Sequence, residues 1–190
     1  MGRIRIGAGT LKGRKILVLA APGLRPTPDR AREALFDILG QDLSGLRVLD
    51  AFAGSGALGF EALSRGAERV VFLESDRACA AAIRDAARAL GVEGRCAVVV
   101  GRAEREIAGG VQGGPFHLVL ADPPYADSAA REEFVLAVAR AREAVPEGAR
   151  VAVERESRVP PVPSPPGLRH TRTARYGRTS FDFYLAVQKS

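Results

Sequence analysis

Asparagine is absent from this chain of 190 residues, and cysteine and histidine occur only twice each. The absence of asparagine removes a thermolabile residue type and points to a heat-tolerant source. Cys79 and Cys96 lie far apart without partners at metal-ligand spacing, so we expect buried free thiols and no metal site. His117 stands in an apolar run and His170 among arginines, and neither forms a triad with a serine. Acyl-transfer chemistry is therefore not expected.

Long apolar segments are also absent, because no run approaches the ~20 residues that a membrane span needs. The first residues, Met1–Ile6, lack the long apolar stretch of a secretory signal. We therefore expect a cytoplasmic protein with no membrane partner. A length of 190 residues fits one domain with a proper core, and we expect a monomer.

Lysine is scarce, with only Lys12, Lys15 and Lys189, although lysine and arginine together number 28 against 22 acids. The resulting net charge of +6 favours a polyanionic partner. The guanidinium group of arginine can donate two parallel hydrogen bonds to a phosphate and can stack on a base, so arginine suits RNA binding. A GC-rich genome would also favour arginine codons, so both explanations stand.

Basic and apolar residues alternate near the N-terminus, and glycines interrupt the pattern. This predicts a small β-hairpin with one basic face over residues 1–22, ahead of a larger domain over residues 23–190. We expect the hairpin to bind RNA and to contribute nothing to the core of the larger domain. The alternative is that its charged face is simply solvated. The predicted RNA contacts are Arg3, Arg5, Lys12, Arg14 and Lys15 on the hairpin, with Arg25 and Arg30 on the segment that follows it.

A helix is predicted next. Thr27 is placed to cap it, with Pro28 at its first position. Its apolar stripe ends at about Leu39, and Arg30 and Arg32 are expected to face away from that stripe.

An apolar strand ending at Asp50 then runs into a glycine loop. Gly54, Gly56 and Gly59 match the spacing of dinucleotide sites, so a nicotinamide-dependent oxidoreductase stays an alternative. Asp50 would repel a pyrophosphate but would favour a cation, such as the amino-acid part of S-adenosylmethionine. Glu74, about 20 residues past the loop at the end of the next strand, is placed to meet ribose hydroxyls. The predicted cofactor-binding residues here are Asp50, Phe52, Gly54, Ser55, Gly56 and Glu74.

The segment Asp122-Pro123-Pro124-Tyr125 follows a second apolar run, Phe116–Ala121, that reads as a buried strand. Prolines donate no backbone hydrogen bond and fix φ, so we expect the carbonyls of Asp122 and Pro123 to act as acceptors. With Tyr125 as a stacking face, the segment suits a planar group that carries an exocyclic amine. An ordinary turn is the alternative. If this strand neighbours the one before the glycine loop, methyl donor and amine acceptor meet between them.

Strands and helices alternate from Arg47 onward, which indicates an α/β fold with a doubly wound, Rossmann-like parallel sheet. Strands are predicted over residues 47–50, 69–74, 97–100, 117–121 and 150–154. Helices are predicted over residues 57–65, 77–90, 103–108 and 129–144. An antiparallel pair over residues 169–174 and 180–187 closes the chain.

Four motifs in this order resemble the RsmD-type methyltransferases, which modify the exocyclic N2 of a guanine in bacterial small-subunit ribosomal RNA. They are Leu24–Phe36, Leu49–Gly59 with Glu61–Ala67, Asp122–Tyr125 and Tyr176–Thr179. The second and third alone would indicate only an amino-methyltransferase, and the first narrows the family. The resemblance implies a class I methyltransferase fold with an antiparallel C-terminal strand, S-adenosylmethionine as cofactor, and ribosomal RNA or the small ribosomal subunit as partner.

The resemblance also assigns roles and marks one departure. In the family the stretch that holds Arg25 and Arg30 lies near the active site, so these two arginines would lie nearer the target base; a purely structural helix is the alternative. Asp122 and Pro123 would hold the target amine and Tyr125 would stack on the base, as catalytic residues. Many methyltransferases carry an acid that touches adenine where this chain has Arg102, which cannot accept from the adenine amine. We therefore expect that contact from the backbone near Ala103 or from elsewhere in the chain. Adenine N6 of DNA, a protein glutamine, and a non-catalytic RNA-binding role remain alternatives.

Overall fold

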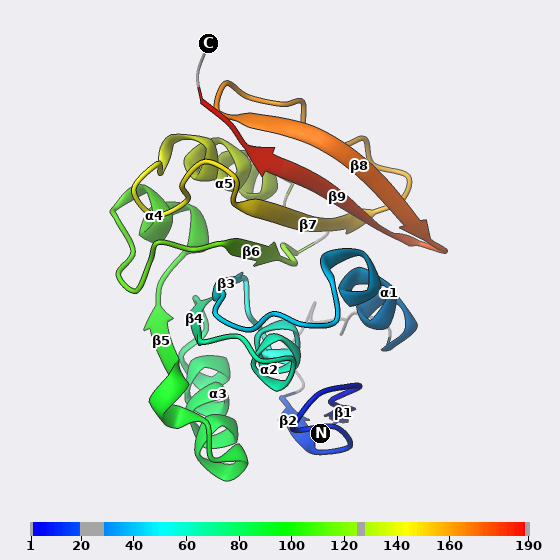
Figure 1. The fold of residues 1–190 in the computed structure, drawn as a ribbon, viewed down its shortest axis with the longest axis vertical. Coiled ribbons are helices and arrows are strands. Elements are labelled where there is room, and N and C mark those ends of the chain that lie inside the picture. The colour runs from blue at the N-terminus through cyan, green and yellow to red at the C-terminus, as the bar shows by residue number, and fades with distance from the viewer. Residues whose placement is uncertain (1, 20–28, 125–127, 189–190) are drawn as a thin grey trace.

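A seven-stranded sheet forms the centre of the computed structural model, which describes residues 2–19, 29–124 and 128–188 (Figure 1). The strand order is β5-β4-β3-β6-β7-β9-β8, and β9 runs antiparallel to both of its neighbours. A separate antiparallel pair, β1 and β2, lies near the N-terminus. The strands are β1 Gly2–Arg5, β2 Lys15–Val18, β3 Arg47–Ala51, β4 Arg69–Glu74, β5 Cys96–Val100, β6 Leu118–Ala121, β7 Arg150–Glu156, β8 Leu168–Tyr176 and β9 Thr179–Ala186.

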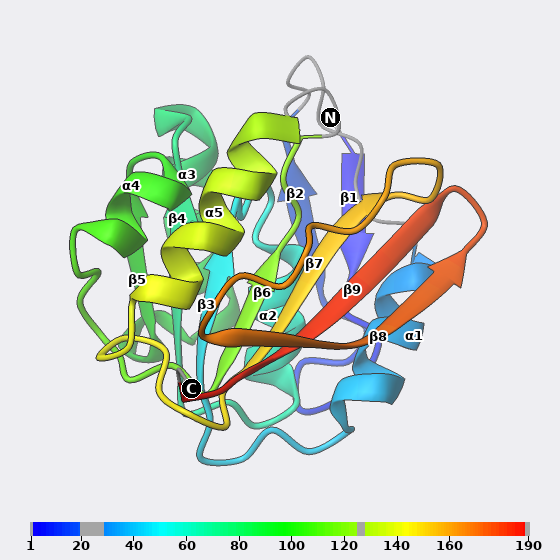
Figure 2. The same cartoon turned by 90° about the horizontal axis from the view of Figure 1, so that it is seen from above.

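The α-helices in the described part of the chain cover both faces of this sheet (Figures 1 and 2). The hairpin, α1, α2 and α3 contribute to the apolar cluster on one face, and α4 and α5 to the cluster on the other. The helices are α1 Asp29–Leu39, α2 Ala57–Ser64, α3 Arg77–Leu90, α4 Ala103–Ala108 and α5 Ser128–Arg140, with a 3-10 turn at Glu93–Arg95. The predicted α/β fold class and the antiparallel C-terminal pair are confirmed.

The direction in which the sheet is wound reverses beside β3. The chain moves outward from β3 through β4 to β5, and it then returns to form β6 on the other side of β3. β3 and β6 pair in parallel, with Asp50 opposite Leu120 and Ala51 opposite Ala121. The carboxyl ends of these two strands flank the switch point, where ligands of such sheets bind. The strand that carries Asp50 and the strand that leads into Asp122 are therefore neighbours, which meets the condition set from the sequence.

The N-terminal hairpin has one basic face and one buried face. Arg3 pairs with Leu17 and Arg5 with Lys15, so these four side chains share the outer face. Ile4 points to the opposite face and is only 7% exposed. The predicted hairpin and its basic face are both present.

The hairpin is nevertheless part of the main core, contrary to our expectation. Ile4, Ile6 and Ile16 belong to the same apolar cluster as side chains of α1, α2 and β3. In the loop that follows β1, the Gly7 amide donates to the Glu61 carboxylate in α2 at 2.8 Å. Removing residues 1–20 would expose this core and leave Glu61 without its backbone donors, so truncation cannot isolate the role of the basic face.

α1 ends where predicted, but Arg32 does not face solvent. Its side chain is buried, donates to the Arg5 carbonyl at 2.7 Å and pairs with Asp29 at 2.9 Å. It also lies 3.8 Å from the Glu61 carboxylate. The long arginine side chain reaches a buried acid of another helix, which the spacing of apolar residues does not reveal. The predicted cap, Thr27–Pro28, lies outside the described residues.

Several element ends differ from the prediction by one residue, and the ends of α5, β7 and β8 differ by more. α5 ends at Arg140 rather than at residue 144, because the chain turns and the Ala144 carbonyl accepts from the Phe116 amide at 2.7 Å. β7 continues to Glu156, because it pairs with β9 as far as Thr179. Within the ranges that the structure describes, no helix has the length and apolar character to cross a membrane.

Candidate active site and nucleic-acid interface

The loop between β3 and α2 carries the backbone angles that its glycines allow. Gly54 and Gly56 have φ of 54° and 75°, and Phe52 also has a positive φ of 60°. A bulky residue in this region stores backbone strain, and such strain clusters at functional sites. The Phe52 ring packs edge-on against Phe134 of α5 at a centroid distance of 5.3 Å. This contact fixes the loop, with the half-buried Ser55 between the two glycines.

Gly59 lets the acid at the end of β3 approach α2. A Cβ at this position would lie 2.3 Å from Phe72 and 2.9 Å from the Asp50 carboxylate. The Gly59 amide instead donates to Asp50 at 2.8 Å. Burial raises the pKa of Asp50 to about 8; the Gly59 hydrogen bond lowers that pKa and the charge of Glu74 raises it. A cationic group brought beside the loop would favour the ionised carboxylate.

Glu74 supports the same loop from the end of β4. Its side chain is buried, with one oxygen accepting from the Gly54 amide at 2.6 Å and the other from the Asp76 amide at 2.7 Å. A carboxylate offers about four acceptor positions, so capacity remains for ribose hydroxyls. Glu74 therefore lies beside the glycine loop, where the sequence predicts it.

The start of α4 lies next to Glu74, because the Gly101 amide donates to the Glu74 carbonyl at 3.0 Å. Ala103, the first residue of α4, is buried. Sequence reasoning missed the acid Glu104, which is also buried and pairs with Arg102. The Glu104 carboxylate is already paired with Arg102. The backbone near Ala103 stays our prediction for the adenine contact.

Asp122 follows β6 directly and stays attached to β3. Its amide donates to the Ala51 carbonyl at 3.4 Å. Asp122 is half-buried, Pro123 is buried and Pro124 is exposed, which gives the segment both an anchored and an accessible side. Tyr125, the predicted stacking face, lies outside the described residues.

Acids from several strand ends share one face of the sheet. Leu120 packs in the cluster on the α1 and α2 side, and side-chain alternation puts Asp122 on that side as well. Asp50 is opposite Leu120 and shares the same face. Sequence reasoning ended a strand at Glu154 but gave this residue no role, although it is buried one residue beyond the last pair of β6 with β7. An acid at the end of an apolar strand, as at Glu74, was the available signal.

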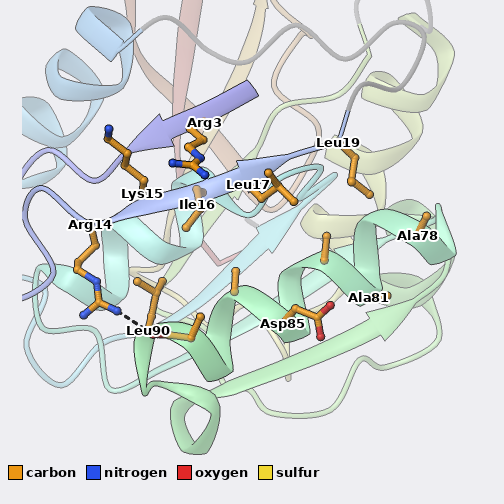
Figure 3. A pocket seen from close by; sticks show the side chains of 13 residues that line it. Arg3, Arg14, Lys15, Ile16, Leu17, Leu19, Ala78, Ala81, Asp85 and Leu90 are labelled. Carbon is orange, nitrogen blue, oxygen red and sulfur yellow. Dashed lines mark hydrogen bonds between the residues drawn. The ribbon is translucent and has the colours of Figure 1, made fainter. Parts of the chain in front are cut away.

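A groove of about 570 Å³ lies between the hairpin and α3 (Figure 3). Arg3, Arg14 and Lys15 line its hairpin side, together with Leu17, which is 42% exposed. Arg14 donates to the Ala89 carbonyl at 2.7 Å, so part of its role is to cap the end of α3. A guanidinium has five N–H donors, so Arg14 can also contact a phosphate.

The predicted RNA contacts fall into two places. The hairpin cations are all exposed: Arg3, Arg5, Lys12, Arg14 and Lys15. Arg30 is exposed at the start of α1, and Arg25 lies outside the described residues. The fold therefore carries these five cations on the hairpin and its loop and keeps Arg30 on a separate element.

The histidines and cysteines have packed surroundings. The His117 Nδ1 atom accepts from a backbone amide of β3 at 3.1 Å, which confirms a packing role. His170, for which no partner was identified from sequence, lies 3.8 Å from Asp182. Cys79 is buried as expected and Cys96 is half-buried, and burial raises the pKa of both thiols to about 11.

Comparison with known proteins gives one family over almost the whole chain. The family model described as Conserved hypothetical protein 95 matches residues 4–185. Two curated proteins named Ribosomal RNA small subunit methyltransferase D are similar: that of Haemophilus influenzae is 42% identical over 125 residues, and that of Escherichia coli K12 is 44% identical over 124 residues. Each alignment covers 65% of this chain, and they cover 65% and 61% of the relatives, under two thirds of their length.

A solved structure described as the putative methyltransferase yhhF from Escherichia coli has the same architecture. It matches with a TM-score of 0.82 and 36% sequence identity, and the match covers 99% of this chain and 100% of that one. The class I methyltransferase fold expected from the four motifs is confirmed. The chain therefore belongs to the RsmD family, whose model is described as Conserved hypothetical protein 95.

Proposed function

We propose that this protein transfers a methyl group from S-adenosylmethionine to the exocyclic N2 amine of a guanine in small-subunit ribosomal RNA. The observation that carries the proposal is the parallel pairing of β3 with β6, which sets Asp50 and Asp122 at neighbouring strand ends on one face. Family membership supports the ribosomal RNA substrate, because the curated relatives are named for it.

The residues of the glycine loop fit this cofactor. Glu74 keeps acceptor capacity for ribose hydroxyls beside the Gly54 amide. Asp50 accepts from the Gly59 amide in the first turn of α2, and once ionised its negative charge suits the cationic amino acid and disfavours the pyrophosphate of a dinucleotide. Phe52, Ser55 and Gly56 complete the proposed site, with the Ala103 backbone toward adenine. When bound, the cofactor supplies an electrophilic methyl group on sulfur.

The protein would promote the reaction by positioning the amine against the methyl group and by the electrostatic effect of its acceptor groups. Guanine N2 is a poor nucleophile because its lone pair is delocalised into the ring. The Asp122 carboxylate and the Pro123 carbonyl would accept the amine hydrogens, localise that pair and aim it at the methyl carbon. A nitrogen–carbon bond forms as the sulfur–carbon bond breaks, and the acidic product ammonium then loses its proton without a strong base.

Extruding the base costs a few kcal/mol, least for an unpaired nucleotide. Tyr125 stacking on the base would offset this by roughly 1–3 kcal/mol. Within the same chemistry, adenine N6 or a protein glutamine would need a similar pocket. The basic face of the hairpin favours nucleic acid over protein. We further propose that the protein acts as a monomer in the cytoplasm, on free RNA or on the small subunit.

Methyl transfer from tritiated S-adenosylmethionine onto RNA from cells lacking this protein tests the proposal directly. Nucleoside analysis should find the label in N2-methylguanosine. Label in adenosine, or none in RNA, would reject the guanine assignment. Calorimetry with S-adenosylmethionine and NAD side by side should show binding of the first alone, which separates a methyltransferase from an oxidoreductase.

Glu74→Ala should weaken binding of S-adenosylmethionine by roughly 1–3 kcal/mol, the scale of a hydrogen bond to a charged group. The loss has two sources, because Glu74 would meet the ribose and also holds the Gly54 amide at 2.6 Å. Calorimetry measures the change. The exposed acid Glu93 provides a matched control, and Glu93→Ala should bind as the wild type does. Unchanged affinity in Glu74→Ala would remove this residue from the site.

Reversing two charges on the hairpin should weaken RNA binding and flatten its salt dependence. Arg3 and Lys15 are exposed and line the groove, so Arg3→Glu with Lys15→Glu spares the buried isoleucines. Each lost phosphate contact reduces the log–log salt slope by about 0.7–0.9, so the double variant should lose roughly 1.4–1.8. Cofactor affinity should stay at the wild-type value.

The same charge change on the edge strand β8 is the matched control. Arg169 and Arg172 are both exposed there, and Arg169→Glu with Arg172→Glu should leave the slope nearly unchanged. If the β8 variant loses RNA affinity while the hairpin variant keeps it, the RNA interface lies along β8 and the hairpin is structural.

A further inference from the structure

A buried acid stands next to Asp122 in the sheet. The pairing of β6 with β7 ends at Ala121 opposite Val153, so Glu154 is one step further and level with Asp122. Neighbouring strands lie about 4.8 Å apart, which makes the two acids immediate cross-strand neighbours. Both lie at the switch-point edge of the sheet, where the proposed acceptor base would bind.

Glu154 also faces the same side of the sheet as Asp122. Ala152, two residues before it in β7, packs in the cluster of the α1 and α2 side. Phe181 of β9, its partner in the pairing of β7 with β9, belongs to that cluster as well. Alternation therefore turns the Glu154 side chain to this side, where Asp50 also lies. Glu154 is only 2% exposed, so its carboxyl is shielded from bulk water.

A buried carboxylate is costly unless it has a use or a partner. Two other buried acids of the described chain have a structural role. Glu61 binds arginines and loop amides, and Asp182 binds Arg155 at 2.6 Å. Glu154 also has an interaction within the chain. Because a carboxylate has about four acceptor positions, one more donor can be accommodated.

We infer that Glu154 determines specificity for guanine by accepting the N1–H of the target base. This inference rests on the proposed methyl transfer to guanine N2. A guanine presents N1–H and the N2 amine side by side on its Watson–Crick edge, the edge by which extruded bases are read. If Asp122 and the Pro123 carbonyl accept the amine hydrogens, the neighbouring N1–H points toward β7, where the Glu154 carboxylate can accept it. Adenine has an acceptor at N1, and a carboxylate oxygen that acts as an acceptor forms no hydrogen bond with it.

The test uses small-subunit RNA that carries one of two bases at the nucleotide methylated by the wild-type protein. One RNA has guanine there, and the other has 2,6-diaminopurine, which keeps the 2-amino group but has an acceptor at N1. A site built to bind a donor rejects an analogue that lacks it, so the wild type should prefer guanine by about 100-fold or more. Glu154→Gln should lower transfer to guanine at least about tenfold and narrow the preference to below about tenfold, because a glutamine amide can also donate.

Equal loss on both RNAs in Glu154→Gln, with the preference unchanged, would show that Glu154 is only structural. Equal transfer by the wild type to both bases would overturn the inference without any variant, which keeps the test decisive if Glu154→Gln fails to fold. Binding of S-adenosylmethionine by the variant, compared with the wild type, monitors folding. Failure of the wild type to methylate the guanine RNA would instead reject the proposed function, and the inference with it.

Discussion

Replacing Asp122 with alanine should nearly abolish methyl transfer and leave the affinity for S-adenosylmethionine close to the wild-type value. The reason is its place in the fold: Asp122 follows β6, while the proposed cofactor contacts come from β3, β4 and the loop after β3. Asp122 should therefore touch the acceptor amine rather than the donor. Tritiated methyl transfer and calorimetry measure the two effects separately.

A matched control for this variant is Glu132→Ala, which removes an exposed acid of α5 and should keep the wild-type rate. A tenfold rate loss corresponds to about 1.4 kcal/mol of barrier. If Asp122→Ala keeps more than about a tenth of the rate, its contribution is below that value and Asp122 is not central to the reaction. An equal loss of cofactor affinity would show that Asp122 contacts the methyl donor rather than the acceptor amine.

The largest loss of stability is expected from Glu61→Ala. The Glu61 carboxylate is 2% exposed, pairs with Arg65 at 2.9 Å and accepts from the Gly7 and Ala8 amides at 2.8 and 3.1 Å. The buried Arg32 guanidinium lies 3.8 Å away. Alanine would leave two buried guanidinium groups short of their counter-charge and would release the hairpin loop. Breaking a buried pair in this way costs about 3–5 kcal/mol.

Thermal unfolding should show this as a fall in melting temperature of roughly 6–20 °C for a domain of this size. The surface pair of Arg47 with Glu68, at 3.4 Å, offers the control. Both side chains are substantially exposed, so Glu68→Ala should cost at most about 1 kcal/mol. A loss below about 1 kcal/mol in Glu61→Ala would show that the hairpin and the two arginines do not depend on this carboxylate.

The local pattern of the sequence determined most of the element bounds. β4 Arg69–Glu74, α3 Arg77–Leu90 and α4 Ala103–Ala108 agree with the prediction at both ends. The signals are local: at α3, Asp76 caps the first turn by accepting from the Cys79 amide at 2.8 Å, and Gly91 closes the helix with a φ of 71°. Capping and periodicity act within a few residues, so they can be read without knowledge of the fold.

The sequence also determined which motifs belong together, because strands of one doubly wound sheet direct their carboxyl ends to a common edge. Asp50, Glu74 and Asp122 each follow or end an apolar strand, and the sheet order brings their strands together. The gathering of these acids at one edge of the sheet was therefore predictable from residue types and their positions near strand ends. Whether Tyr125 and Arg25 complete that site stays a prediction.

Only the tertiary structure decided which contacts connect the hairpin, α1 and α2. It also decided which further acid lies next to Asp122 at the carboxyl edge of the sheet. The Gly7 amide and the Glu61 carboxylate are 54 residues apart in sequence, and Arg32 reaches the same carboxylate from a third element. Glu154 became a neighbour of Asp122 through the register of β6 with β7. Contacts of this kind depend on long-range packing, and neither helical nor strand periodicity encodes where a long polar side chain finds its partner.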